Sequence, residues 1–286
     1  MIVIVGCLVV IGCVISGFVI SGGEVGALIH PAEILTIGGA AVGAMIIMSS
    51  KKQLGDLMKG LIACLKGSPF GKEAYRELFK MMYDIMQTAR RDGLLSLEPH
   101  LSKPHDSSIF NKYPKISHNH HLMDFICGGL MPIVEGTTKP DQIPMLLEAE
   151  LKVIEEEHHA PIHVLSRIND SLPGFGIVAA VLGIVITMAA IDGPVEEIGH
   201  KVGAALVGTF LGILASYGFV GPMVGRMEML GHEEMSFFRT AESIIVGFVN
   251  DLNPKVAIDV ARRGVPSEMR PKREEMDALF KETTAA

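Results

Sequence analysis

The sequence predicts an all-α integral membrane protein with four transmembrane helices, a large helical cytoplasmic loop between the second and third, and a cytoplasmic C-terminal tail. Hydrophobic residues make up 49% of the 286 residues, and charged residues only 20%. The charges are also segregated, because several long stretches carry none while others are dense in them. Each uncharged stretch is close to the ~20 residues with which a helix crosses a ~30 Å hydrocarbon core.

Four stretches without internal charge are the predicted spans, and they cover residues 1–20, 34–50, 172–191 and 202–225. The first stretch lacks the basic start of a secretory signal peptide, so we expect it to be a retained helix. The second is short but adequate, and it ends at two lysines. Buried helices of a large soluble protein are the alternative, but four such runs exceed what one soluble core needs.

Basic residues beside the spans predict the orientation of the chain. They follow the second and fourth spans, at Lys51, Lys52, Lys59, Lys66 and Arg226, whereas the turns over residues 21–33 and 192–201 are mainly acidic. The positive-inside rule therefore places the long loop, the tail and the N-terminus in the cytoplasm. The predicted organisation is a first transmembrane hairpin (1–50), a cytoplasmic helical domain (51–171), a second hairpin (172–225) and a cytoplasmic tail (226–286).

The cytoplasmic loop contains apolar residues at helical spacing. This spacing predicts one amphipathic helix over residues 54–65 and another over residues 75–86. A third amphipathic helix, over residues 144–159, is expected to lead toward the third span. After Arg263, in contrast, the charged run over residues 268–281 is expected to be frayed or disordered.

The second of these helices ends in a cluster of charges. Arg90 and Arg91 suit the negative end of the helix dipole, and Gly93 can adopt a left-handed capping conformation. We expect Ser96 to be the N-cap of another helix, which would place Glu98 beside the arginines at a helix-hairpin tip. Charged helix ends that only favour caps and solubility would produce the same pattern.

Composition argues against several kinds of chemistry. A net charge of −7 disfavours nucleic acid as a partner, and the four cysteines form no CxxC pair or metal-ligand spacing. The histidines at positions 118, 120, 121, 158 and 159 lack a nearby cysteine or a regular i,i+4 pair, so we interpret them as solvated surface and not as metal ligands. They also lack the geometry of a catalytic cluster, and we therefore do not expect an enzyme.

The predicted spans contain almost no ionisable residues. The first, third and fourth spans have none, and Glu33 lies only at the outer end of the second. A chain that moved protons alone would need a titratable group within the membrane. If the protein serves an ion pathway, the carboxylate must come from a partner helix. A small-solute transporter, the alternative from another class, would show inverted repeats or polar midplane sites, and neither is found.

Small residues recur in the spans at the spacing of helix-packing faces. The pairs are Gly39 with Gly43, Gly176 with Ala180, Ala179 with Gly183, Gly199 with Gly203, and Gly208 with Gly212. Such faces allow two helix backbones to approach closely in lipid, where no hydrophobic force drives the helices together.

Two prolines and a few hydroxyl groups complete the inventory of the spans. Pro173 and Pro222 lie near the inner ends of the third and fourth spans, where each can end or kink its helix. Thr187, Thr209 and Tyr217 are polar groups at depth. We expect the Thr187 hydroxyl to bond the carbonyl four residues earlier in its own helix.

Three runs of residues together resemble the MotA family of flagellar motor stator subunits. They are RRDGLLSLE at 90–98, NDSLPGFGIVAA at 169–180 and VGTFLGILASYGFVGP at 207–222. The opening, with SGG at 21–23 and HPAE at 30–33, is similar as well. The resemblance extends from residue 1 to about residue 265. The related ExbB and TolQ energisers are the nearest alternative, but they have three spans and lack the 90–98 tip.

The resemblance implies a partner and an assembly. The chain would form a ring, a homo-pentamer, around the transmembrane helices of a MotB dimer in the bacterial inner membrane. MotB would supply the ion-binding aspartate and the cell-wall anchor, and the proton would be the coupling ion, with no cofactor. Arg90 and Glu98 match the charged pair with which the family engages the rotor protein FliG.

The resemblance also assigns roles within the membrane. Pro173 and Pro222 match the prolines at the mouth of the ion path, and Thr209 matches the hydroxyl that faces the partner's aspartate. Tyr217 belongs to the same path. Sodium-driven relatives carry Thr or Ser where this chain has Ala180, which favours protons as the coupling ion.

Overall fold

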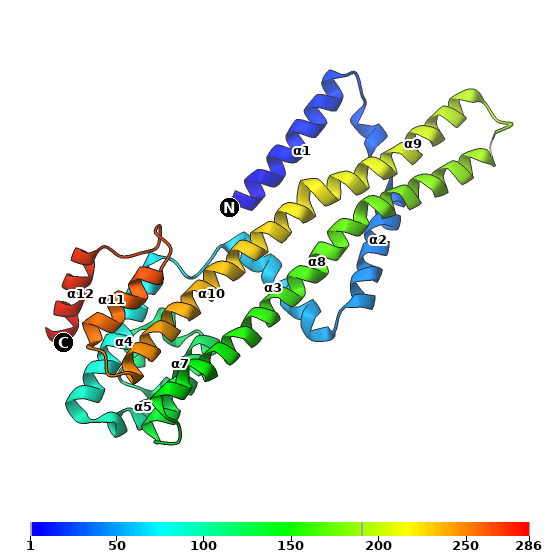
Figure 1. Cartoon of the computed structure of the whole chain (residues 1–286). Coiled ribbons are helices and arrows are strands. Elements are labelled where there is room, and N and C mark those ends of the chain that lie inside the picture. The colour runs from blue at the N-terminus through cyan, green and yellow to red at the C-terminus, as the bar shows by residue number, and fades with distance from the viewer. Residues whose placement is uncertain (1, 190, 286) are drawn as a thin grey trace. The chain divides into compact units, whose positions relative to one another are not determined.

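The structure is a computed structural model that describes residues 2–189 and 191–285, with side chains up to residue 282 (Figure 1). Within these residues the chain is helical and has no strand. It divides into two compact units, Met1–Gly67 with Glu157–Leu230, and Ser68–Glu156 with Gly231–Ala286. Packing therefore groups residues 51–67 with the spans and most of the tail with the loop, whereas the predicted boundaries followed hydropathy.

The first unit contains the membrane helices. Its elements are α1 (Ile2–Ile20), the 3-10 turn η1 (Val25–Leu28), α2 (Pro31–Met48), α3 (Lys51–Lys66), α9 (Val195–Ile213) and the π-helix η6 (Leu214–Val220). Two long helices, α8 (Ile143–Met188) and α10 (Gly221–Val249), extend through both units. Among the residues that the structure describes, four segments are long and apolar enough to cross a membrane: Ile2–Ile20, Val25–Met48, Pro140–Met188 and Val195–Val249. The prediction of an all-α membrane protein with four spans is thus confirmed.

The large apolar side chains of these helices point outward. None of the residues of α1 is buried, and on α2 the side chains of Leu35 and Ile47 are 75% and 88% exposed. In water such surfaces would drive aggregation, but in a bilayer they face the acyl chains. Small and medium-sized residues fill the inside of the unit, where Ile37 and Ala41 of α2 pack against α8.

The second unit has a core of large apolar and aromatic side chains that are buried away from water. Its elements are α4 (Lys72–Asp92), η2 (Leu94–Leu97), α5 (Glu98–Ser102), η3 (Pro104–Asp106), η4 (Phe110–Lys112), α6 (Pro114–Ser117), α7 (His120–Val134), η5 (Pro140–Gln142), α11 (Pro254–Gly264) and α12 (Arg273–Ala285). Phe237 of α10 lies at its centre, with its ring 4.9 Å from Phe70 and 4.7 Å from Tyr75. Burial of aromatic surface away from water stabilises this unit.

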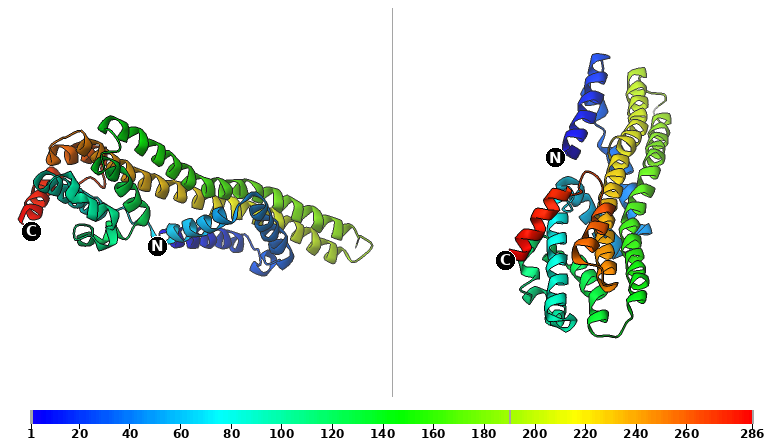
Figure 2. Two further views of the ribbon diagram at one scale, coloured as in Figure 1. Left: turned by 90° about the horizontal axis from the view of Figure 1, so that it is seen from below. Right: turned by 60° about the vertical axis from the view of Figure 1, so that its left-hand side comes forward.

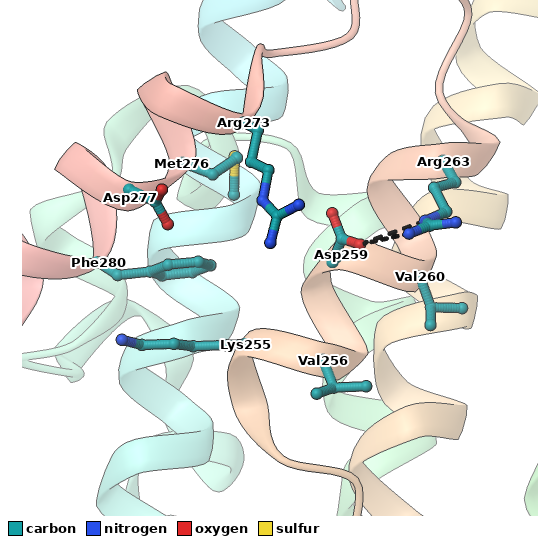
Figure 3. Close-up of a pocket in the computed structure, with 9 residues that line it drawn as sticks. All are labelled: Lys255, Val256, Asp259, Val260, Arg263, Arg273, Met276, Asp277 and Phe280. Atoms are coloured by element: carbon teal, nitrogen blue, oxygen red, sulfur yellow. Dashed lines mark hydrogen bonds and ion pairs between the residues drawn. The ribbon is translucent and has the colours of Figure 1, made fainter.

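The expectation of a frayed or disordered run over residues 268–281 is wrong. Residues 273–285 form α12, and Met276, Leu279 and Phe280 are buried. The Phe280 ring lies 4.8 Å from that of Tyr83 on α4, and Figure 3 shows it stacked over Lys255 of α11. These three apolar residues at i, i+3 and i+4 form a helical face that only the presence of α4 and α11 makes stable.

Two ion pairs hold the outer face of α12 to α4. The Nζ atom of Lys72 lies 2.9 Å from Oε1 of Glu275, and the Nζ of Lys80 lies 2.7 Å from Oε2 of Glu282. The hydrogen bonds from these lysines hold the pKa of each glutamate below its ordinary value. A shallow pocket between α11 and α12 remains open, with Arg273 pointing into it (Figure 3).

The prediction for Ser96 is also wrong. Ser96 lies inside η2, and its hydroxyl donates a hydrogen bond to the carbonyl of Gly93 at 2.6 Å. It therefore does not cap the next helix, α5, which begins at Glu98 directly after η2. Gly93 does adopt a positive φ of 88°, a conformation that favours glycine and reverses the chain between α4 and η2.

Candidate functional site

The backbones of α8 and α9 approach each other closely within the membrane unit. Figure 2 shows the second half of α8 alongside α9 in both of its views. Gly176 of α8 faces Gly208 and Gly212 of α9: a Cβ atom added to Gly176 would lie 2.9 Å from the Gly208 carbonyl oxygen and 3.2 Å from the Gly212 Cα. Only glycine fits where two backbones approach this closely.

The same stripe continues along both helices. A Cβ atom on Gly212 would lie 2.7 Å from the carbonyl oxygen of Leu172, and one on Gly208 would lie 3.1 Å from the Cβ of Ala179. Toward the other end, Gly183 meets Ala205 in the same way, at 2.8 Å. The small residues of the two spans therefore form one continuous contact. On α8 it extends from Gly176 to Gly183, or about two helical turns.

The other predicted small-residue pairs do not meet a neighbour within the described chain. Cβ atoms added to Gly39, Gly43, Gly199 or Gly203 would have open space around them. These glycines thus leave small-residue surfaces uncovered on α2 and near the start of α9.

Neither proline ends its helix, although ending was one of the two outcomes we expected. Pro173 lies inside α8, which continues to Met188. Pro222 is the second residue of α10, directly after the π-helix η6. Because proline has no N–H and its ring crowds the preceding turn, the wider π register before Pro222 accommodates it.

A hydrogen bond joins the π-helix η6 to α8. The hydroxyl of Ser216 donates to Asn169, with its Oγ 2.9 Å from the backbone oxygen and 3.0 Å from Oδ1. Ser216 is buried, and Gly221 packs against the same asparagine. Neither residue was singled out from the sequence. The signal was present, since Ser216 is a polar residue within the apolar run of the fourth span.

Two of the predicted ion-path residues, Ala180 and Thr209, lie beside the α8–α9 contact. Ala180 and Thr209 are half-buried next to Gly208 and Gly176, and Tyr217 within η6 is 71% exposed. The hydroxyl of Thr187 donates to the carbonyl of Gly183 at 2.8 Å, as predicted for a bond within its own helix. The region therefore offers hydroxyl groups beside two helices whose spans, at residues 172–191 and 202–225, contain no acid.

The helix-hairpin tip in the second unit holds the other predicted pair. Both Arg90, in the last turn of α4, and Glu98, the first residue of α5, are exposed. The Nη2 of Arg90 also donates to two carbonyl oxygens just after α10, those of Asp251 at 3.4 Å and Leu252 at 3.1 Å. Arg90 therefore joins the tip to the turn between α10 and α11, a structural role not anticipated from the sequence.

Burial and a neighbouring carboxylate raise the pKa of two glutamates and one cysteine in the same unit. Burial, followed by the charge of Asp124, raises the pKa of Glu150, and the same two causes raise the pKa of the Cys127 thiol to about 12. Burial and the nearby Glu148 raise the pKa of Glu242. The Cys127 thiol therefore stays protonated and unreactive at neutral pH.

Comparisons with known proteins agree with this geometry. Residues 4–93 match the family model described as Motility protein A N-terminal, and residues 117–239 match the MotA/TolQ/ExbB proton channel family. Motility protein A of Salmonella typhimurium is 36% identical over 271 residues, which make up 95% of this chain and 92% of that protein.

Two solved structures share the fold. A structure of MotAB from C. jejuni has a TM-score of 0.76 at 21% identity, and the match covers 95% of this chain and 98% of that one. The flagellar MotAB stator complex from Bacillus subtilis has a TM-score of 0.73 at 24% identity, covering 93% and 96%. With its four spans, its α8–α9 glycine contact and these relatives, the chain belongs to the Motility protein A family, within the MotA/TolQ/ExbB proton channel family.

Proposed function

We propose that this chain is a stator subunit of the flagellar motor in the bacterial inner membrane. Five copies surround a MotB dimer, and the complex couples inward proton flow to torque on the rotor protein FliG. The solved relatives in the comparison are MotAB complexes, one of them described as a flagellar stator. A pentamer, FliG as the rotor partner and the proton as coupling ion are parts of the proposal.

One observation carries the proposal: the closely packed third and fourth spans have hydroxyl groups but no acid. Residues 172–191 and 202–225 contain no Asp, Glu, His, Lys or Arg, while Thr209 lies half-buried at the α8–α9 contact. A proton needs a titrating group to cross the membrane interior. The aspartate of MotB supplies that group in the proposal, and Ala180 leaves no extra oxygen for a sodium ion.

The energy of each proton is sufficient for a conformational step. One charge that crosses 100 mV releases about 2.3 kcal/mol. In the proposal, protonation of the partner's aspartate shifts α8 and α9 near Pro173 and Pro222, and the ring rotates against the rotor. Arg90 and Glu98 contact the rotor through exposed ion pairs, which contribute only ~0–1 kcal/mol each and so can form and break at every step.

Reconstitution in vesicles tests the borrowed carboxylate. We expect no steady proton flux with this chain alone, and flux when the partner is present. Replacement of the partner's membrane aspartate by asparagine should abolish the flux while leaving the complex intact on gel filtration. Steady proton flux through the chain alone would overturn the proposal.

Charge reversal at the tip tests the rotor contact. Arg90→Glu and Glu98→Lys should each reduce motor torque under load, and reversal of matching charges on the rotor should restore it. Arg91→Glu is the matched control, because Arg91 pairs with its neighbour Asp92 at 2.8 Å. Unchanged torque in both reversals would remove Arg90 and Glu98 from this role.

Ion substitution tests the coupling ion. Swimming speed should fall with a protonophore and should not depend on external sodium. A speed that follows the sodium concentration would show that the inference from Ala180 is wrong.

A further inference from the structure

Helix α3, which follows the second span, presents three different faces. Leu57 and Cys64 are buried to 2% exposure against Met227 of α10, and this packing fixes the rotation of α3 about its axis. The adjacent face is apolar and exposed. It consists of Met58, Ile62 and Leu65, which are 56%, 47% and 46% exposed and are spaced by four and three residues.

Lysines occupy the far side of the exposed apolar face. Lys52, Lys59 and Lys66 are spaced by seven residues, or about two helical turns, so they form one row along α3. Lys52 bonds Glu157 at the start of that row. Lys59 pairs with the half-buried Asp56 of its own helix at 3.1 Å, and 81% of its side chain remains accessible. The row therefore offers cations that are accessible at Lys59 and Lys66.

The position of α3 relative to the membrane follows from its neighbours. The second span, α2, ends at Met48, and the chain turns sharply before Ser50 caps α3 through the backbone N–H of Gln53 at 3.2 Å (Figure 1). Helix α3 also contacts α1, and in Figure 1 its far end lies near the start of α1. The end of α2 and the start of α1 are the two ends of the first hairpin, and both are predicted to be cytoplasmic. Helix α3 thus begins at the predicted cytoplasmic end of α2 and contacts α1.

We propose that α3 lies in the inner leaflet of the membrane and binds the headgroups of anionic phospholipids through Lys59 and Lys66. The apolar face with Met58 and Ile62 enters the acyl boundary, and the lysine stems extend from it toward the headgroup phosphates, as in other amphipathic interfacial helices. The charge of α3 favours this occupant, because its four lysines outnumber its one aspartate. A second protein surface over the same face would have to accommodate an apolar stripe and a row of cations together.

Tryptophan fluorescence tests the position of the apolar face. The natural chain has no tryptophan, so Ile62→Trp introduces a single reporter into the full-length protein. In phosphatidylcholine–phosphatidylglycerol vesicles, brominated acyl chains should quench this tryptophan and aqueous iodide should not. Leu95→Trp, at the 70% exposed Leu95 of the hairpin tip, is the control and should show the reverse. Quenching of Ile62→Trp by iodide alone, or by neither agent, would overturn the proposal, since the face would then lie in water or under protein.

Lipid retention tests the lysines. Each lysine near an anionic surface strengthens binding about fivefold, so Lys59→Gln with Lys66→Gln should weaken phosphatidylglycerol retention about 25-fold in native mass spectrometry. The control replaces two exposed lysines of the second unit, Lys103 and Lys152, by glutamine and should retain the lipid as the natural chain does. Equal retention by both double variants, with unchanged helix content, would overturn the proposed headgroup site.

Discussion

The two units of this protein place their large apolar side chains in opposite directions. In the membrane unit, α8 and α9 meet through Gly176, Gly208 and Gly212, while Val185 and Ile186 of α8 are each 61% exposed. In the other unit the largest apolar side chains are the most deeply buried, and both Phe237 and Phe238 are inaccessible. The comparison shows that the surrounding solvent decides which residues belong between helices.

The physical reason is the source of the packing energy. Water drives apolar surface together, so a water-exposed unit gains stability from large side chains in its core. Lipid is as apolar as leucine, so helices within it gain stability from close backbone approach and from hydrogen bonds such as that between Ser216 and Asn169. Substitutions of opposite kinds should therefore damage the two units.

The largest effect is expected when a large side chain is removed from the second unit. Phe237→Ala should destabilise it by about 3–5 kcal/mol, because the cavity removes ring contacts with Phe70 and Tyr75. Urea unfolding in lipid nanodiscs, followed by circular dichroism, measures this. Ile186→Ala in the membrane unit is the control and should change stability by less than about 0.5 kcal/mol. Equal costs would contradict the comparison.

A smaller effect is expected when a side chain is added in the membrane unit. Gly212→Ala should destabilise the α8–α9 contact by about 1–3 kcal/mol, because its Cβ would lie 2.7 Å from a backbone oxygen. Gly203→Ala on the same helix meets open space, and it corrects for the better helix propensity of alanine. The thermal midpoint of the purified protein should fall in the first variant only.

Loss of the bond across α8 and η6 should have a still smaller effect. Ser216→Ala removes a buried donor from Asn169 and should cost about 1 kcal/mol. Thr187→Val is the matched control, because the Thr187 hydroxyl bonds only its own helix. If both variants lose the same stability in a thermal scan, the bond between helices has no special contribution.

The smallest effect concerns α12, whose ion pairs with α4 are exposed to water. Glu275 and Glu282 have pKa values lowered below 4.5, so their contribution is present above that pH and is lost as the pH falls through the lowered values. Hydrogen-exchange protection factors of residues 273–282, corrected for the intrinsic pH dependence of exchange, should fall in this acid range. Lys72→Gln with Lys80→Gln should remove the pH dependence, whereas Lys103→Gln should leave it unchanged.

Much of the membrane unit was predictable from the sequence because its signals are local. Transfer of an apolar run into lipid depends on the residues of that run alone, which is why the four spans and the own-helix bond of Thr187 agree with prediction. The absence of acids from residues 172–191 and 202–225 is likewise a property of the sequence itself. It determined that any proton path must use a carboxylate from elsewhere.

Only the tertiary structure decided which distant segments meet. Six of the thirteen residues of α12 are charged, and its three large apolar residues form a stable face only because α4 and α11 lie beside them. The bond from Ser216 to Asn169 and those from Arg90 to the carbonyls after α10 join residues far apart in the chain. Such contacts depend on relative position in space and not on local hydropathy, so no pattern within either segment could reveal its partner.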